Sequence, residues 1–429
     1  MTDIALPDTS LTLDPPPDTA TPDNQKQLER LLRECVDVLS ATRAQGSESN
    51  KAVSLGSVAR KSLEPFPAPP YFDFASLEAL LRHCADAGAS GIHFGPGMPV
   101  TVSIYGRMES ITQRALSNPE CASIAKFLHN DEAPALVLSR KPVRSAYAFH
   151  YQGRPYRFRL QMTAVEENFQ DAVHIVARIL PPAPPSFTAL ALPQDLQDAL
   201  LRYREGMIVV SGPTASGKTT LLASALLELA NRQPLNILTY EEPIEYVHPT
   251  CLPNGSVILA TEIGRHVEDW ETAVTTALRR EPNIILVGEL LDHPTLMAIQ
   301  RLSMTGHLCL TTLHATGFAA TLNMLFNLFP ESQRKQALRG LLQEVRLIIS
   351  QRLIPCTDGT RTAVWEYLEF KPAVVERLLD TDNIPLTSKM ILPDYGYRFK
   401  NALDAKLDAG LITDDVYRWG LRELCGIIF

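Results

Sequence analysis

Residues 212–220 are the segment whose residue types and spacing point most clearly to chemistry. They are Gly212, Pro213, Thr214, Ala215, Ser216, Gly217, Lys218, Thr219 and Thr220, and they match the phosphate-loop pattern G-x-x-x-x-G-K-[ST] at every fixed position. An apolar run precedes the loop and a helical pattern follows it, so backbone N–H groups and the positive end of a helix would converge on phosphate oxygens. We predict that Lys218 reaches the β and γ phosphates of a nucleotide and that the Thr219 hydroxyl takes one magnesium position.

Carboxylates follow two other apolar runs of the chain. Glu289 comes directly after the run at 284–287, where an acid can polarise water or hold magnesium through water. Glu241, Glu242 and Glu245 form an acidic cluster after an earlier run. A carboxylate at the end of a strand is more often a solvated edge residue, so these acids gain meaning only together with the phosphate loop.

The elements that would position these residues form an α/β pattern. Short apolar runs at residues 207–210, 236–240, 284–287 and 308–312 alternate with helical patterns, which is typical of buried parallel strands with helices between them. The part before them, from residue 72, mixes alternating strand patterns with two helical ones. The sequence therefore predicts a parallel α/β domain preceded by a smaller α+β domain.

Proline-rich stretches mark the predicted boundaries. We place a mostly disordered arm at residues 1–70, a smaller domain at 71–181, a linker at 182–192 and the α/β domain at 193–429, with a mainly helical part at 330–429. Inside the arm, residues 24–44 carry apolar side chains at helical spacing. This helix would either dock on a partner or membrane surface or pack on its own protein.

Composition excludes several classes of protein. The chain has 429 residues, 40 Lys and Arg against 48 Asp and Glu, and a net charge of -8, which disfavours a sequence-independent nucleic-acid binder. Its seven cysteines are scattered without C-x-x-C spacing, so we expect neither a zinc site nor a disulfide framework. The sequence shows no membrane-spanning apolar run and no secretory signal, and we therefore expect a cytoplasmic protein.

The order of the motifs resembles the secretion ATPase superfamily that includes PilT and GspE. The segments G-P-T-A-S-G-K-T-T, E-E-P-I-E-Y-V-H, L-R-R-E-P-N-I-I-L-V-G-E, and T-G-H-L with T-L-H-A are similar to its Walker A loop, aspartate box, Walker B segment and histidine box. Upstream, G-A-S-G-I-H-F at 88–94 and the arginine-bearing strands at 156–160 and 175–178 resemble its PAS-like N-terminal domain.

The resemblance implies an architecture, a reaction and a set of residues. It implies a RecA-like P-loop ATPase domain behind a PAS-like domain, assembled as a homohexamer that hydrolyses ATP with Mg²⁺. Thr219 would hold the magnesium, partly through water with Glu289. The remaining roles fall to Glu289 and Glu245, which would position or activate water, to His314 and also His307 as γ-phosphate sensors, and to Arg159, Arg178 and Arg279 as arginine fingers.

The C-terminal segments resemble the DotB and TraJ branch of the superfamily, which serves type IVB secretion and plasmid conjugation. Residues 355–370 and 405–413 carry this likeness, the retraction-motor motif A-I-R-N-L-I-R-E is replaced by V-V-E-R-L-L-D-T at 374–381, and the tetracysteine element of GspE-like proteins is missing. We therefore predict a cytoplasmic motor, peripherally associated with inner-membrane machinery, that powers substrate transfer without direct sequence-specific binding to nucleic acid. The alternatives are a type IV pilus retraction or assembly motor, a nucleic-acid motor, and a nucleotide-binding structural ring without turnover.

Three positions depart from the family pattern. Glu242 stands where the aspartate box usually has Asp, Leu291 stands where G-E-x-R-D has Arg, and Gly91 replaces the Asp of A-S-D-I-H. The loss of an arginine next to the catalytic acid predicts a slow or partner-dependent ATPase.

Overall fold

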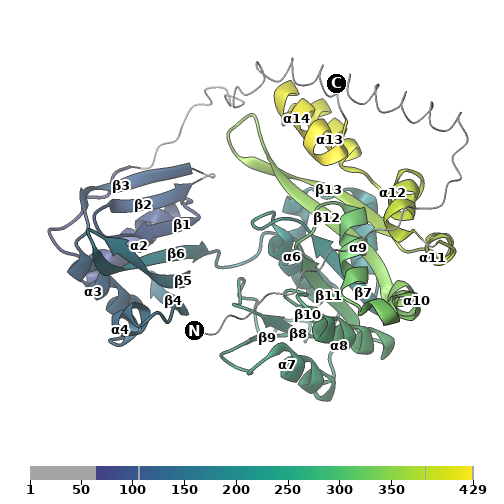
Figure 1. Cartoon of the computed structure of the whole chain (residues 1–429), viewed down its shortest axis with the longest axis horizontal. Coiled ribbons are helices and arrows are strands. Elements are labelled where there is room, and N and C mark those ends of the chain that lie inside the picture. Colours follow the sequence, from purple (N-terminus) through teal and green to yellow (C-terminus); the bar gives the residue numbers. More distant parts are fainter. Residues whose placement is uncertain (1–63, 105–106, 382, 428–429) are drawn as a thin grey trace, which may run out of the picture. The chain divides into compact units, whose positions relative to one another are not determined.

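The computed structural model describes residues 64–104, 107–381 and 383–427 (Figure 1). These residues all belong to one compact unit, Ala59–Phe429. The predicted arm lies almost entirely outside the described residues, and the predicted helix at 24–44 lies wholly outside them. Within the described part of the chain, no helix is long and apolar enough to cross a membrane.

The first half of the described chain forms a six-stranded antiparallel sheet with helices on one face. Its order is β3-β2-β1-β6-β5-β4. The strands are β1 (Gly91–Phe94), β2 (Pro99–Ile104), β3 (Arg107–Ala115), β4 (Val143–Tyr151), β5 (Arg154–Glu167) and β6 (Gln170–Leu180), and the helices are α2 (Phe74–Asp86), α3 (Asn118–Leu128) and α4 (Ala133–Leu138). Side chains from these helices and from the covered face form one hydrophobic core.

Alternation along β5 decides which of its side chains enter this core. Phe158 and Leu160 are buried in it, whereas Arg157 and Arg159 on either side of Phe158 are only partly buried, as expected when successive strand residues point to opposite faces. Arg159 lies directly opposite Arg178 of β6 in the strand register. The sheet therefore presents arginines on the face that its helices leave uncovered.

The second half forms a seven-stranded sheet with the order β13-β12-β7-β11-β10-β8-β9. Its strands are β7 (Gly206–Ser211), β8 (Asn236–Glu241), β9 (Val257–Glu262), β10 (Ile284–Val287), β11 (Leu308–Leu313), β12 (Val345–Pro355) and β13 (Arg361–Glu369). All neighbours pair in parallel except β12 and β13, which form an antiparallel hairpin. The four strands predicted from apolar runs are β7, β8, β10 and β11.

Helices cover both faces of this sheet. One face packs against η1 (Phe187–Leu190), α5 (Gln194–Arg202) and α6 (Lys218–Arg232). The other packs against α7 (Trp270–Ala277), α8 (His293–Met304), α9 (Phe318–Asn327), α10 (Arg334–Glu344), α11 (Pro372–Leu379) and α12 (Ile384–Tyr395). Ile208 and Val210 of β7 enter the core on the α5–α6 side of the sheet, and Met207 and Val209 enter the core on the opposite side. Because both faces of the strand are buried, its sequence is an uninterrupted apolar run.

The prediction that residues 330–429 are mainly helical was wrong for the segment 345–369. This segment forms the β12–β13 hairpin, which extends the parallel sheet beyond β7 (Figure 1). The helices α13 (Phe399–Asp408) and α14 (Asp414–Cys425) come later in the chain. They form a small core of their own with Ile354 and Val364 of the hairpin.

Candidate nucleotide site

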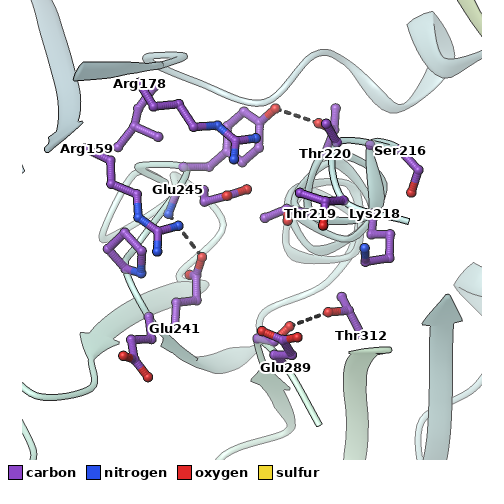
Figure 2. A pocket seen from close by; sticks show the side chains of 18 of the residues that line it. Arg159, Arg178, Ser216, Lys218, Thr219, Thr220, Glu241, Glu245, Glu289 and Thr312 are labelled. Carbon is purple, nitrogen blue, oxygen red and sulfur yellow. Dashed lines mark hydrogen bonds between the residues drawn. The ribbon is translucent and has the colours of Figure 1, made fainter. Parts of the chain in front are cut away.

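The carboxyl ends of β7, β8, β10 and β11 open into a cavity of about 820 Å³. Parallel α/β sheets hold ligands at this edge. Figure 2 shows the side chains that line it, with Lys218, Thr219 and Thr220 at the start of α6 and with Glu289 and Thr312 at the ends of neighbouring strands. Residues 214–220 of the predicted phosphate loop therefore share one space with the predicted catalytic acid Glu289.

The phosphate loop joins β7 to α6 through backbone conformations that favour glycine. Gly217, the N-cap of α6, has φ 87° and Gly212 has φ 149°, a region that side chains beyond glycine rarely adopt. The Ser216 hydroxyl is buried and has no hydrogen-bond partner within the described chain. A buried unpaired hydroxyl next to a helix N-terminus fits a loop that is shaped for an anionic ligand.

Lys218 is buried in the loop and engages the loop's own carbonyls. Its Nζ donates to the carbonyl oxygens of Gly212 and Pro213, at 2.9 and 3.0 Å. Burial lowers the pKa of Lys218, whereas the charges of Glu289 and Glu245 act in the opposite direction. An ammonium group that donates to neutral carbonyls is available to exchange them for phosphate oxygens.

Glu289 and His314 lie together in the cavity. His314 Nε2 is 2.9 Å from Glu289 Oε1, and both side chains are partly exposed. The residue before Glu289 is Gly288, where a Cβ would approach the carbonyl oxygen of Tyr240 to 3.2 Å. The close packing of β10 on β8 thus leaves little room beyond glycine directly before the catalytic candidate.

The acidic cluster after β8 divides into buried and exposed carboxylates. Glu241 is buried, accepts a 2.8 Å hydrogen bond from Thr239 Oγ1 and accepts another from the backbone N–H of Glu245 at 3.3 Å. Burial raises the pKa of Glu241 to about 7, although these hydrogen bonds and the charge of Arg157 act against the rise. Glu242 is exposed and Glu245 is partly buried, and all three line the cavity.

Arg157 of β5 holds this acidic loop by its backbone. Its guanidinium donates to the carbonyl oxygens of Ile244 and Glu245, at 3.0 and 3.1 Å. Burial lowers the pKa of Arg157, and nearby Glu241 and Glu262 oppose the change. Because Arg157 holds two successive carbonyls of the loop, it restricts where the Glu245 side chain can lie.

The open face of the first sheet contributes further arginines to the cavity. Arg159 and Arg178 line it, as does Arg144 of β4. Arg159 and Arg178 are direct cross-strand neighbours, a placement in which like charges repel each other. An anion between them would relieve this repulsion, so the pair is suited to the phosphate chain of a nucleotide.

Two predicted residues lie elsewhere. His307 precedes β11, and its Nδ1 lies 3.0 Å from Thr305 Oγ1 and 3.1 Å from the carbonyl oxygen of Leu302. Arg279 is exposed in η2 (Leu278–Arg280), before the start of β10. Both therefore sit at the amino ends of their strands, whereas the cavity lies at the carboxyl ends.

The sequence interpretation gave no role to several residues that the structure places at this site. Arg157 could have been found from strand alternation, since it shares a face with Arg159 two positions on. Glu241 was seen as part of an acidic cluster but was given no role. Gln351 donates a hydrogen bond to the phosphate loop and accepts one from Trp365. Both residues lie on strands that were not predicted.

The donor set is compatible with Mg²⁺ held jointly by protein and phosphate. The described residues contain no group of three or more His, Cys, Asp or Glu that could hold a metal alone. Thr219 and Glu289 both line the cavity and offer the hard oxygen ligands that Mg²⁺ prefers, and Mg²⁺ is usually held by one or two protein groups plus substrate phosphates.

Comparison with known proteins identifies the family. The model of the Type II/IV secretion system proteins matches residues 74–383. The chain belongs to this family.

Individual relatives include pilus motors. The type IV pilus ATPase PilU of Pseudomonas aeruginosa is 26% identical over 339 residues, which are 79% of this chain and 83% of PilU. The retraction ATPase PilT of the same organism is 30% identical over 304 residues, covering 70% of this chain and 83% of PilT.

Solved structures include both a secretion ATPase and a pilus motor. The ATPase DotB of Legionella pneumophila matches with a TM-score of 0.77 and 32% identity, over 85% of this chain and all of DotB. The pilus retraction motor PilT with bound ADP matches with a TM-score of 0.67 and 27% identity, over 81% of this chain and 97% of PilT. The predicted membership of the PilT/GspE superfamily, the likeness to DotB and the RecA-like fold class are confirmed.

Proposed function

We propose that this chain is a magnesium-dependent ATPase that works as a homohexameric motor of a type IVB secretion or conjugative transfer system, at the cytoplasmic side of the inner membrane. One observation carries the enzymatic part: the phosphate loop and the Glu289–His314 pair line one cavity. The match over the full length of DotB supports the choice of system.

Hydrolysis requires a water molecule to attack the γ-phosphorus and lose a proton while ADP leaves. Glu289 has the position and chemistry to orient that water and accept its proton, with His314 holding the carboxylate at 2.9 Å. Lys218 and the loop amides neutralise charge on the phosphates, and Glu245 provides a second carboxylate from the Arg157-bound loop. Thr219, with Glu289 through water, would hold Mg²⁺, which would supply further positive charge to the transferring phosphoryl group.

The arginines of the first sheet would connect hydrolysis to movement. Arg159 and Arg178 lie on one sheet, and the phosphate loop follows a strand of the other. A nucleoside triphosphate that contacts both the arginines and the phosphate loop would hold the two sheets together. Release of the γ-phosphate after hydrolysis would remove this connection. We expect substitution of either arginine to lower turnover more than it lowers ADP affinity.

A pilus motor is the second candidate, and the matches to PilU and PilT favour it. The two systems can be separated in the source organism with a Lys218→Ala allele. Loss of protein or DNA transfer with normal pilus retraction would support the proposed system. Loss of twitching with normal transfer would favour the pilus motor.

The experiment that tests the enzymatic proposal is steady-state magnesium-ATPase across a protein concentration series, with oligomer mass measured in parallel. We expect turnover to rise with hexamer formation and to vanish in Glu289→Gln, while ADP binding persists. A ring that binds ATP but never turns it over would instead support a structural role. Leu291 suggests this alternative, because it lines the cavity at the position where the family pattern has an arginine.

A further inference from the structure

The phosphate loop is supported from behind by one side chain of β12. Gln351 is buried, and its Nε2 donates a 2.7 Å hydrogen bond to the carbonyl oxygen of Ser216, within the loop. Gln351 Oε1 accepts a 2.9 Å hydrogen bond from Trp365 Nε1. Two hydrogen bonds thus connect the indole of Trp365 on β13, through the side-chain amide of Gln351 on β12, to the phosphate loop.

The indole fixes the orientation of the amide. Gln351 and Trp365 are direct cross-strand partners, so their side chains share one face of the hairpin. An indole N–H can only donate, and it must therefore face the amide oxygen. The amide nitrogen is then left to face Ser216, where it meets a carbonyl oxygen.

The hydrogen bond to Ser216 also determines where the next N–H points. In a trans peptide the C=O and the following N–H point in opposite directions. With the Ser216 carbonyl held toward Gln351, the Gly217 N–H points away from it, and Gly217 lines the cavity. The Gly217 N–H has no backbone hydrogen-bond partner among the described residues, so it is free to donate to a ligand.

Packing shows that Gln351 lies directly against the loop. A Cβ added at Gly217 would come within 2.7 Å of Gln351 Nε2, and one at Gly212 would come within 2.3 Å of the Gln351 backbone oxygen. Gln351 therefore packs so closely on the loop that neither glycine has room for a side chain on that side.

We propose that Gln351 is a positioning residue for nucleotide phosphate, which acts by holding the Ser216 carbonyl so that the Gly217 N–H faces the ligand, and that Trp365 sets its orientation. This inference rests on the proposed nucleotide site. It adds to that site a determinant of phosphate affinity that lies on the β12–β13 hairpin, outside the phosphate-loop motif.

The test is the ADP dissociation constant of the full chain, measured by calorimetry for wild type, Gln351→Glu and Gln351→Met at pH 8 and pH 6. A glutamate here is buried, so its carboxyl pKa is raised. At pH 8 the carboxylate repels the Ser216 carbonyl, whereas the protonated acid at pH 6 can donate to it as the amide does. At pH 8 we expect the ADP dissociation constant of Gln351→Glu to exceed that of wild type by about tenfold or more, which corresponds to about 1.4 kcal/mol. At pH 6 we expect the same ratio to be below about threefold.

Methionine has a similar length and no hydrogen-bond donor, so Gln351→Met should weaken ADP binding about tenfold at both pH values, since tenfold corresponds to the loss of one buried hydrogen bond. Trp365→Phe removes the indole N–H and keeps an aromatic ring, and we expect a smaller loss. These two variants decide the question if Gln351→Glu does not fold.

Two results would overturn the inference. One is that folded Gln351→Glu and Gln351→Met proteins bind ADP as tightly as wild type at both pH values. The other is a Gln351→Glu deficit that is the same at pH 6 and pH 8. Failure of the wild type to bind ADP would instead contradict the proposed function itself.

Discussion

Replacement of Glu241 by glutamine should change how the stability of the protein depends on pH. Glu241 is buried at the end of β8, and burial raises the pKa of its carboxyl from 4.5 to about 7. Between these two pH values the folded state therefore holds a proton that the unfolded state releases. Glutamine has nearly the same shape, can still accept the hydrogen bond from Thr239, and does not titrate.

The size of the effect follows from the difference between the two pKa values. The folded-state value is the higher one, so the contribution of Glu241 to stability is fully present below about pH 4.5 and is lost as the pH rises through about 7. One pKa unit corresponds to 1.36 kcal/mol, so ionisation of Glu241 costs the folded state about 3 kcal/mol by pH 8. Glu241→Gln should escape this cost.

The assay is urea unfolding of wild type and Glu241→Gln at a series of pH values from 5 to 8. We expect the variant's free energy of unfolding, relative to wild type, to increase across this range by about 2 to 3 kcal/mol, because part of the total change falls below pH 5. Any constant difference in hydrogen bonding cancels, because only the change with pH is compared. Glu242→Gln is the matched control, since Glu242 is the adjacent and exposed carboxylate, and its difference from wild type should stay flat. A flat difference for Glu241→Gln as well would refute the reasoning.

Three further substitutions have definite expected outcomes. Gly217→Ala places a Cβ at φ 87° and within 2.7 Å of a buried amide, so calorimetry should show ADP affinity reduced more than about tenfold, strain at such a φ costing about 1–3 kcal/mol. Arg157→Ala frees the carbonyls of Ile244 and Glu245, and steady-state kinetics should show kcat falling about tenfold with little change in ADP affinity, as expected from a misplaced catalytic group. Arg114→Ala leaves the carboxylate of Glu120, which is 2% exposed, without its partner, and urea unfolding should show a loss of about 3–5 kcal/mol.

Each substitution has a control in the same chain. Gly153 has φ 78° but open space where a Cβ would lie, so Gly153→Ala should leave ADP affinity unchanged. Arg154, also on β5, pairs with Asp86 at the surface, and Arg154→Ala should leave kcat unchanged. Arg232 forms an exposed pair with Glu228, and Arg232→Ala should cost less than about 1 kcal/mol. Equal effects in a variant and its control would remove the reason given for that variant.

The elements that could be predicted best have a sequence pattern confined to a short segment. They are strands buried on both faces and a loop with a fixed motif. β7, β8, β10 and β11 were visible as short apolar runs because helices cover both faces of the sheet. The phosphate loop was visible because its chemistry requires fixed residue types at fixed spacing. Residues 212–220 and Glu289 could therefore be singled out as site candidates from the sequence alone.

Elements at the margin of a sheet were harder to predict. β3, with the sequence R-M-E-S-I-T-Q-R-A, is an edge strand with few buried side chains, so its pattern resembles a polar loop. β12 carries apolar and polar residues in an order that fits a helix as well as a strand. The role of Gln351 depends on pairing between segments far apart in the chain, and no local pattern reports such pairing.

The position of β7 within its sheet affects when the site can form during synthesis. β7 lies between β11 and β12, so Val209 has Thr311 on one side and Ile348 on the other. A nascent chain that has just completed the phosphate-loop motif has neither neighbour, and pairing between segments so distant in sequence is slow. The apolar β7 then presents unpaired edges, which are prone to aggregation until later strands arrive. The strands on both sides of the phosphate loop are therefore complete only after synthesis has passed β12, long after the phosphate-loop motif itself has been made.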